Sequence, residues 1–181
     1  MMISKSLKNS LANPNDNIYT PKKLAKDCID SFIFEKNDTI LDAFYGNGVF
    51  YNNYPDNIKK DFTEIKKPYE KDFFEYKKNV DYIITNPPFS MITPIFEHTV
   101  NIVNKGFGYI LPGYGLSNKR LQILKDSNFG ITGISYFYVT DWFGFPVIFI
   151  KCEKNKDNLF LFEPNNYKIF DEITNSNKET K

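Results

Sequence analysis

The chain has 181 residues and a mass of 21.2 kDa, which is enough for one compact domain and short for two. Hydrophobic residues make up 41% of the sequence and charged residues 25%, which excludes collagen-like, low-complexity and fully disordered chains. The net charge of +1 gives no global signature of a protein that coats nucleic acid, so any polyanion has to be held by a local patch.

Apolar periodicity and turn residues predict the elements in chain order. Thr20-Pro21 is a helix start signal, and the apolar residues that follow it lie at helical spacing. The sequence predicts helices over 21–33, 91–103 and 116–126, and strands over 39–42, 61–65, 81–85, 106–111, 131–139, 145–152 and 159–162.

Strands that alternate with helices favour an α/β fold with a mostly parallel central sheet and helices on both faces. Residues 1–17 and 172–181 are polar and are expected to be flexible ends. No linker, repeat or composition shift interrupts the chain between them, so we predict a single domain over 18–171.

The two cysteines, Cys28 and Cys152, lack the spacing of metal ligands, and His98 is the only histidine. We therefore expect no metal site and two free thiols, which are typical of a reducing cytoplasm. The polar N-terminus does not resemble a secretory signal, and no run approaches the ~20 apolar residues of a membrane span. These patterns predict a cytoplasmic protein with no membrane partner, located in the host-cell cytoplasm if the source is a virus or phage. His98 and Trp142 are expected to be structural.

Two predicted strands end in polar loops. After the first comes Asp42-Ala43-Phe44-Tyr45-Gly46-Asn47-Gly48, where two glycines allow positive φ angles and a close approach of the backbone to a ligand. After the third comes Asn86-Pro87-Pro88-Phe89. Ligands of open α/β sheets bind at the carboxyl ends of the strands, so these two loops are the candidate site.

This pair of loops resembles the signature of S-adenosylmethionine-dependent adenine-N6 methyltransferases, which have a D-x-F-x-G-x-G loop and an [N/D/S]-P-P-[Y/F/W] motif. The likeness covers roughly residues 18 to 112, and Asn-Pro-Pro-Phe is its most specific part. It implies a reduced, Rossmann-like methyltransferase fold with S-adenosyl-L-methionine as the cofactor. The chain departs from the common pattern at Ala43, where proline is usual, and at Tyr45, where a small residue is usual.

The resemblance also implies roles for individual residues. Those that would bind the cofactor are Tyr19, Thr20 and Pro21 at its methionine end, Asp42, Ala43, Phe44, Gly46 and Gly48 in the glycine loop, Glu64 at the ribose, Asp72 and Phe73 at the adenine, and Asn86.

The chemistry of an aromatic amine explains the second motif. The lone pair of such an amine is delocalised into the ring, so the enzyme has to supply two acceptors that hold the amino hydrogens and turn the lone pair toward the methyl group. Asn86 offers a side-chain oxygen and Pro87 a carbonyl, while Pro88 stiffens the turn. Phe89 offers a ring face on which a base can stack. We therefore predict that Asn86, Pro87, Pro88 and Phe89 form the catalytic motif.

Target recognition has fewer candidates. Lys119 and Arg120 follow a predicted strand and could bind the substrate through phosphates, although solvated lysines explain the pattern equally well. The order of the two loops resembles the γ arrangement of amino-methyltransferases, in which a recognition region follows the catalytic domain. Too few residues follow the second loop for such a region, so we expect either little sequence recognition by this chain or recognition that a second copy of the chain or a partner subunit supplies.

The sequence therefore predicts a methyltransferase that acts on the N6 amine of adenine in DNA. One alternative keeps the fold and methylates an RNA base amine or a protein glutamine amide. The other is a non-catalytic partner subunit with a methyltransferase-like fold, in which Tyr45 fills the cofactor site.

Overall fold

The computed structural model describes residues 18–140, 142 and 146–159. The predicted flexible ends and residues 160–162 of the last predicted strand lie outside the described residues. Leu159 itself is in a bend. Within the described residues the elements are α2 (Lys22–Asp30), β1 (Thr39–Asp42), η2 (Tyr51–Asn53), β2 (Lys59–Phe62), η3 (Phe73–Glu75), β3 (Val80–Thr85), η4 (Phe89–Met91), α3 (Ile92–Ile102), β4 (Val103–Pro112), α4 (Asn118–Asp126), β5 (Phe129–Phe137) and β6 (Val147–Lys154).

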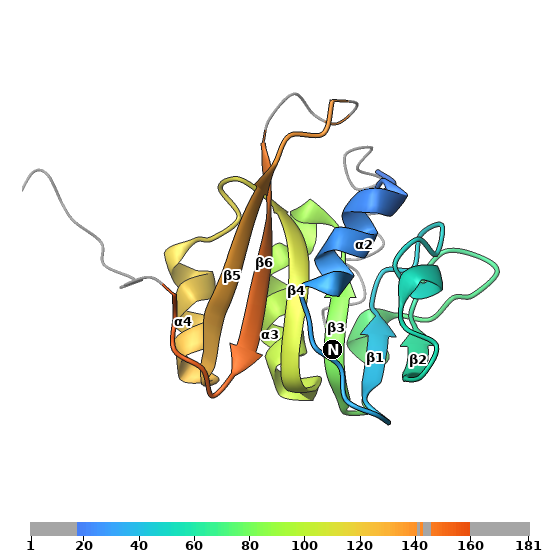
Figure 1. Ribbon diagram of the computed structural model, residues 1–181, viewed down its shortest axis with the longest axis horizontal. Helices are drawn as coiled ribbons and strands as arrows, with labels where there is room; N and C mark the ends of the chain where they lie inside the picture. Colours follow the sequence, from blue (N-terminus) through green and yellow to red (C-terminus); the bar gives the residue numbers. More distant parts are fainter. Residues whose placement is uncertain (1–17, 141, 143–145, 160–181) are drawn as a thin grey trace, which may run out of the picture.

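The strands form one six-stranded sheet in the order β2-β1-β3-β4-β6-β5. The pairs β1–β2, β1–β3 and β3–β4 are parallel, whereas β6 runs antiparallel to both of its neighbours. The carboxyl ends of β1, β3, β4 and β5 therefore lie at one edge of the sheet, which is uppermost in Figure 1. Both candidate loops leave the sheet at this edge.

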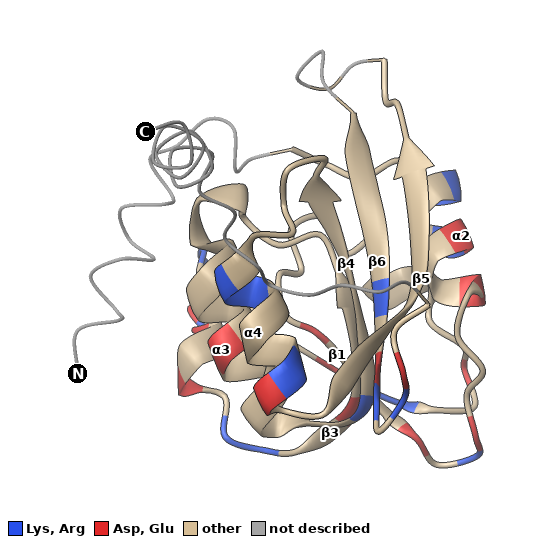
Figure 2. Ribbon diagram, turned by 90° about the vertical axis from the view of Figure 1, so that its left-hand side faces the viewer, with Lys and Arg blue, Asp and Glu red and all other residues tan. Residues whose placement is uncertain are grey.

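Helices cover both faces of the sheet, as predicted, with α2 on one face and α3 and α4 on the other (Figure 2). The central strands β1, β3, β4 and β6 are largely buried on both sides, and their successive side chains alternate between two core clusters. The cluster beneath α2 includes Ile40, Tyr82, Ile84, Ile110 and Phe149, and the cluster beneath α3 and α4 includes Leu41, Ile83, Tyr109, Leu111 and Ile150.

Element boundaries differ from the predictions for local physical reasons. The first helix ends at Asp30 rather than residue 33, because Ser31 bonds the Cys28 carbonyl at 2.7 Å and the chain then turns Phe32 into the core. The strand predicted over 61–65 is β2, which runs over Lys59–Phe62. It is an edge strand with partly exposed residues, so it lacks the apolar pattern of a buried strand. β5 begins and ends two residues before the predicted range 131–139, and β6 begins and ends two residues after the predicted range 145–152.

Gly108 in β4 lies close to two aromatic rings of the core, which leave no room for a side chain. A Cβ at this position would lie 2.4 Å from the ring of Phe149 and 3.0 Å from that of Phe32. We expect Gly108→Ala to lower the free energy of unfolding by about 1–3 kcal/mol, because the added methyl group overpacks the core. Urea denaturation measures the loss. Gly133→Ala in β5 is the matched control, since its Cβ would come no closer than 3.3 Å to Lys151. Equal stabilities of the two variants would contradict the prediction.

Candidate active site

The loop after β1 turns sharply at its two glycines. Gly46 and Gly48 have φ angles of +54° and +77°, a region that favours glycine. A Cβ on Gly48 would lie 2.6 Å from the hydroxyl oxygen of Tyr45. Tyr45 stands where methyltransferases of the resembled family usually have a small residue. Its ring packs against Phe62 with ring centroids 4.5 Å apart, so packing accounts for the larger side chain.

Asp42 lies beneath this loop and is fully buried. Its carboxylate accepts hydrogen bonds from the Thr85 hydroxyl at 2.7 Å, from the Tyr51 amide at 3.2 Å and from the Phe44 amide at 3.4 Å. Burial raises the pKa of Asp42 from its ordinary value of 3.8 to about 6, even though these bonds favour the charged form. Asp42 thus fixes the loop from below and joins it to the end of β3.

The raised pKa of Asp42 predicts a pH dependence of stability. Because the folded chain binds this proton more tightly than the unfolded chain does, the free energy of unfolding falls as the pH rises from about 4 to about 6. An increase of this size in pKa corresponds to about 3 kcal/mol. Asp42→Asn keeps an acceptor oxygen but does not titrate, so the wild-type chain should lose stability relative to this variant across that window. Denaturation curves at several pH values measure the difference, and parallel pH profiles would contradict the assignment.

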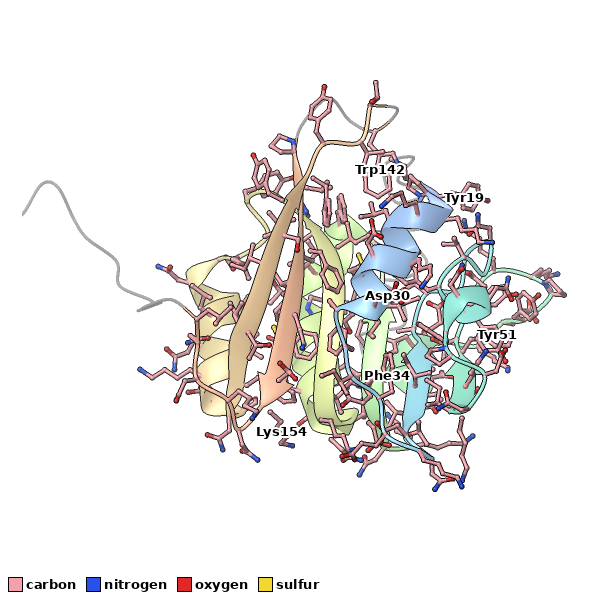
Figure 3. The ribbon with its side chains drawn as sticks, viewed as in Figure 1. Tyr19, Asp30, Phe34, Tyr51, Trp142 and Lys154 are labelled. Atoms are coloured by element: carbon pink, nitrogen blue, oxygen red, sulfur yellow. The ribbon has the colours of Figure 1, made fainter. Side chains whose placement is uncertain are left out.

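Glu64 and Tyr19 meet the glycine loop from two other segments. One carboxylate oxygen of Glu64 accepts the Gly46 amide at 2.8 Å, and the other accepts the Lys66 amide at 2.8 Å. A carbon of the Tyr19 ring lies 4.0 Å from the position of a Cβ on Gly46. Tyr19 is 63% exposed and stands at the start of α2 (Figure 3), followed by buried Thr20 and exposed Pro21. The structure therefore brings three of the sequence-predicted segments together.

The loop after β3 holds an unsatisfied acceptor. The side-chain oxygen Oδ1 of Asn86 is buried and has no hydrogen-bond partner among the described residues. The two residues before it are fixed, since Thr85 bonds Asp42 and the Ile84 carbonyl accepts the hydroxyl of Tyr54. A buried oxygen without a partner costs free energy, which is typical of a site that a ligand completes.

The rest of the motif is rigid. Pro88 has φ −61° and ψ 124°, and its carbonyl accepts the Met91 amide at 3.0 Å at the start of the turn that leads into α3. Pro87 is buried, and Phe89 is half-buried and packs against both core clusters. Backbone geometry therefore fixes the position of this loop.

Asp72 and Phe73 make contacts within the fold at η3. Asp72 caps the short helix η3 by accepting the Phe74 amide at 2.9 Å, and burial raises its pKa. Phe73 is 2% exposed and packs edge-on against Phe44 and His98, with centroid distances of 5.2 and 4.7 Å. His98 is structural, as predicted, because its ring also lies within hydrogen-bond distance of the Tyr76 carbonyl.

We compared the sequence and the fold of the chain with those of known proteins. No protein-family model and no curated protein matches the sequence. A modification subunit assigned to a type I restriction enzyme from Vibrio vulnificus is similar over 99% of this chain, with a TM-score of 0.66 and 12% identity. A protein assigned as an RNA methyltransferase from Pyrococcus horikoshii covers 79% of this chain and 91% of its own, with a TM-score of 0.63 and 17% identity. The chain has a methyltransferase fold.

A further structure with this methyltransferase fold carries a ligand. Magnesium protoporphyrin IX methyltransferase from Synechocystis, which was solved with bound S-adenosylmethionine, covers 84% of both chains with a TM-score of 0.56 and 9% identity. The present chain spans only 57% of the length of the Vibrio subunit. The Rossmann-like α/β fold expected from the two loops is therefore confirmed.

The two candidate phosphate ligands lie on α4, away from the glycine loop. Lys119 forms an ion pair with Glu97 at 2.9 Å. Arg120 donates to the Thr93 hydroxyl at 3.0 Å and to the Gly115 carbonyl at 2.7 Å, so its guanidinium ties the start of α3 to the loop after β4. The structure gives both cations internal partners and does not place either beside Glu64 or Gly46.

Sequence reasoning missed two residues of the site. Thr85 links the two loops through its hydrogen bond to Asp42. Tyr54, at the end of η2, donates its hydroxyl to the Ile84 carbonyl near the end of β3. Thr85 could have been found from the sequence, because a hydroxyl residue ends the apolar strand just before Asn-Pro-Pro-Phe. Nothing in the sequence marks Tyr54.

Both cysteines are free and buried, as expected, and Trp142 is buried in the core. Within the part of the chain that the structure describes, there is no membrane-length apolar helix and no cluster of three or more metal-ligating side chains.

Proposed function

We propose that the chain is an S-adenosylmethionine-dependent methyltransferase that transfers a methyl group to the exocyclic N6 amine of adenine in DNA. The observation that carries the proposal is the buried, unpartnered Oδ1 of Asn86, because an amine hydrogen is the donor that this acceptor lacks. The Thr85–Asp42 bond supports the proposal further, because it joins the residue before Asn86 to the strand end before a glycine loop of the kind that accommodates a cofactor.

The residues around the glycine loop fit the cofactor. Two glycines with positive φ expose backbone without a Cβ, the Glu64 carboxylate faces the loop, and Tyr19 stands over it. A carboxylate oxygen keeps a second lone pair after it accepts an amide, so Glu64 can also accept ribose hydroxyls. When bound, S-adenosylmethionine supplies an electrophilic methyl group on its sulfonium sulfur. Asp72 and Phe73 are proposed to lie on the adenine side of the cofactor.

The chain's own residues then orient the amine. Asn86 Oδ1 accepts one amino hydrogen and the Pro87 carbonyl accepts the other, which turns the nitrogen lone pair out of the ring plane and toward the methyl group. Phe89 stacks on the base and fixes its plane. The methylated nitrogen loses its extra proton to water afterwards, so the reaction requires no histidine base.

The substrate class is tested by incubating the purified chain with radiolabelled S-adenosylmethionine and with DNA, structured RNA or a protein fraction in separate reactions. We expect label in DNA, recovered as N6-methyladenine by mass spectrometry of the nucleosides. Label confined to RNA or protein would reassign the acceptor, and calorimetry that detects no binding of S-adenosylmethionine would support a non-catalytic subunit instead.

A further inference from the structure

Exposed tyrosines gather at the edge of the sheet that carries the candidate active site. Tyr114 is 75% exposed, Tyr136 is 69% exposed and Tyr138 is 65% exposed. Pro112, Val147 and Phe137 lie opposite one another across β4, β6 and β5, so Tyr114 and Tyr138 lie just beyond this row and Tyr136 just before it. We call Tyr114, Tyr136 and Tyr138 the tyrosine edge.

The turn after β4 holds Tyr114 outward. Gly113 donates to the Pro146 carbonyl at 3.0 Å and Gly115 to the Pro112 carbonyl at 2.6 Å. A Cβ on Gly115 would lie 2.6 Å from the Cβ of Leu111, so a larger residue does not fit. Arg120 adds a third tie through the Gly115 carbonyl. A braced turn with glycine on both sides of one exposed ring presents that ring with little loss of conformational entropy on binding.

The tyrosine edge is almost uncharged. Residues 112–118 and 136–140 contain no Asp, Glu, Lys or Arg, and Arg120 has two internal partners. Figure 2 shows the carboxyl ends of β4 and β5 and the amino end of the antiparallel β6 in tan, with charged residues on the helices and at the opposite end of the sheet. Binding of a DNA duplex draws on lysine and arginine contacts to many phosphates. The tyrosine edge offers planar rings instead, and these can stack on the exposed base faces of a single strand but not on bases that are stacked within a duplex.

We propose that the tyrosine edge stacks on unpaired nucleotides that flank the target base, so that the acceptor is a single-stranded or looped-out segment. The inference rests on the proposed function, because it places the target amine at Asn86. β4 is the direct neighbour of β3, and Tyr114 follows β4. β5 is three strand positions from β3 in the sheet, which is about 14 Å at ~4.8 Å per strand. A strand that enters at Asn86 can therefore cross Tyr114 and reach Tyr136 and Tyr138 within a few nucleotides.

Fluorescence anisotropy with the full chain tests the inference. The probes are a labelled 20-nucleotide single-stranded DNA of mixed sequence and the duplex of the same sequence, at 50 and 200 mM NaCl. We expect the single strand to bind at least about tenfold more tightly than the duplex. We also expect its affinity to fall by less than about tenfold between the two salt concentrations, far below the 10³–10⁵-fold loss of proteins that make 6–10 phosphate contacts.

The matched variants separate stacking from general effects. Tyr114→Ala should weaken single-strand binding by about fivefold or more, whereas Tyr114→Phe keeps the ring and should bind as the wild-type chain does. Ile33→Ala is the control, since Ile33 is 87% exposed and lies after α2, near the opposite end of the sheet. Preference for the duplex, absence of binding to either probe, or equal binding by Tyr114→Ala would overturn the inference.

Two further measurements keep this inference distinct from the proposed function. Methyl transfer to single-stranded DNA that is unchanged in Tyr114→Ala would reject the tyrosine edge and leave the enzyme assignment standing. Tyrosine-dependent binding of the single strand without any transfer of label would reject the enzyme assignment alone. A change in oligomeric state on sedimentation of Tyr114→Ala, with unchanged DNA binding, would assign the tyrosine edge to a protein interface and overturn the inference.

Discussion

Asn86→Ala is expected to reduce methyl transfer in a single turnover by about a hundredfold or more, with affinity for S-adenosylmethionine within about twofold of the wild-type value. The Oδ1 atom is the buried acceptor that we assign to the target amine, and loss of one preorganised hydrogen-bonding group at a reacting centre typically costs 10²–10³ in rate. Rapid-quench kinetics with labelled cofactor measure the rate, and calorimetry measures cofactor affinity.

Two variants calibrate this result. Asn86→Asp keeps an acceptor oxygen and should retain a measurable rate. Asn101→Ala removes an exposed amide on α3 that donates to the Glu97 carbonyl in the same helix, so it should transfer as the wild-type chain does. Undiminished turnover in Asn86→Ala would remove Asn86 from the catalytic role.

Gly48→Ala is expected to lower affinity for S-adenosylmethionine at least about tenfold and the free energy of unfolding by about 2–3 kcal/mol. Alanine is strained at a φ of +77°, and its Cβ would lie 2.6 Å from the Tyr45 hydroxyl and 3.0 Å from the Asn52 side chain. The glycine loop therefore has to move to relieve both contacts. Calorimetry and urea denaturation measure the two quantities.

The neighbouring residue provides the control for this variant. Asn47 is exposed in the same loop and its side chain accepts only a long hydrogen bond of 3.3 Å from the Val49 amide among the described residues, so Asn47→Ala should change affinity and stability little. A Gly48→Ala chain that binds the cofactor as Asn47→Ala does would show that the glycine loop is not part of the cofactor site.

Local patterns were sufficient to predict the two loops and the strands before them. β1 and β3 are buried on both faces, so their apolar runs stand out in the sequence, and the polar residues that follow mark the strand ends. β2 is paired on one side only and carries Lys59, Lys60 and Asp61, so its pattern is weak and its boundary was misplaced.

Contacts between distant segments could not be predicted. The Thr85–Asp42 bond joins residues 43 positions apart, and the Gly46–Glu64 bond joins residues 18 positions apart. The role of Arg120 stayed open between phosphate binding and a solvated face, because its internal partners, Thr93 and Gly115, become neighbours only when α3 and α4 pack together. The exposure of Tyr114 likewise depends on a tie between Gly113 and Pro146 that only the folded sheet creates.

The bond between Asp42 and Thr85 is the physical basis of the proposed reaction. It fixes the ends of the two strands that precede the glycine loop and Asn-Pro-Pro-Phe to each other, through two fully buried side chains on adjacent strands. Methyl transfer depends on the relative position of donor and acceptor, and displacements of about 1 Å already cost a large factor in rate. A rigid link at this point serves that requirement.

A crystal structure of the chain with S-adenosylhomocysteine, the demethylated cofactor, would show whether the methyl donor and Asn86 meet as proposed. We expect this molecule to bind over Gly46 and Gly48 with a ribose hydroxyl on Glu64 and its sulfur facing the Oδ1 of Asn86. A complex in which it binds elsewhere, or in which its sulfur points away from Asn86, would rule out the proposed reaction.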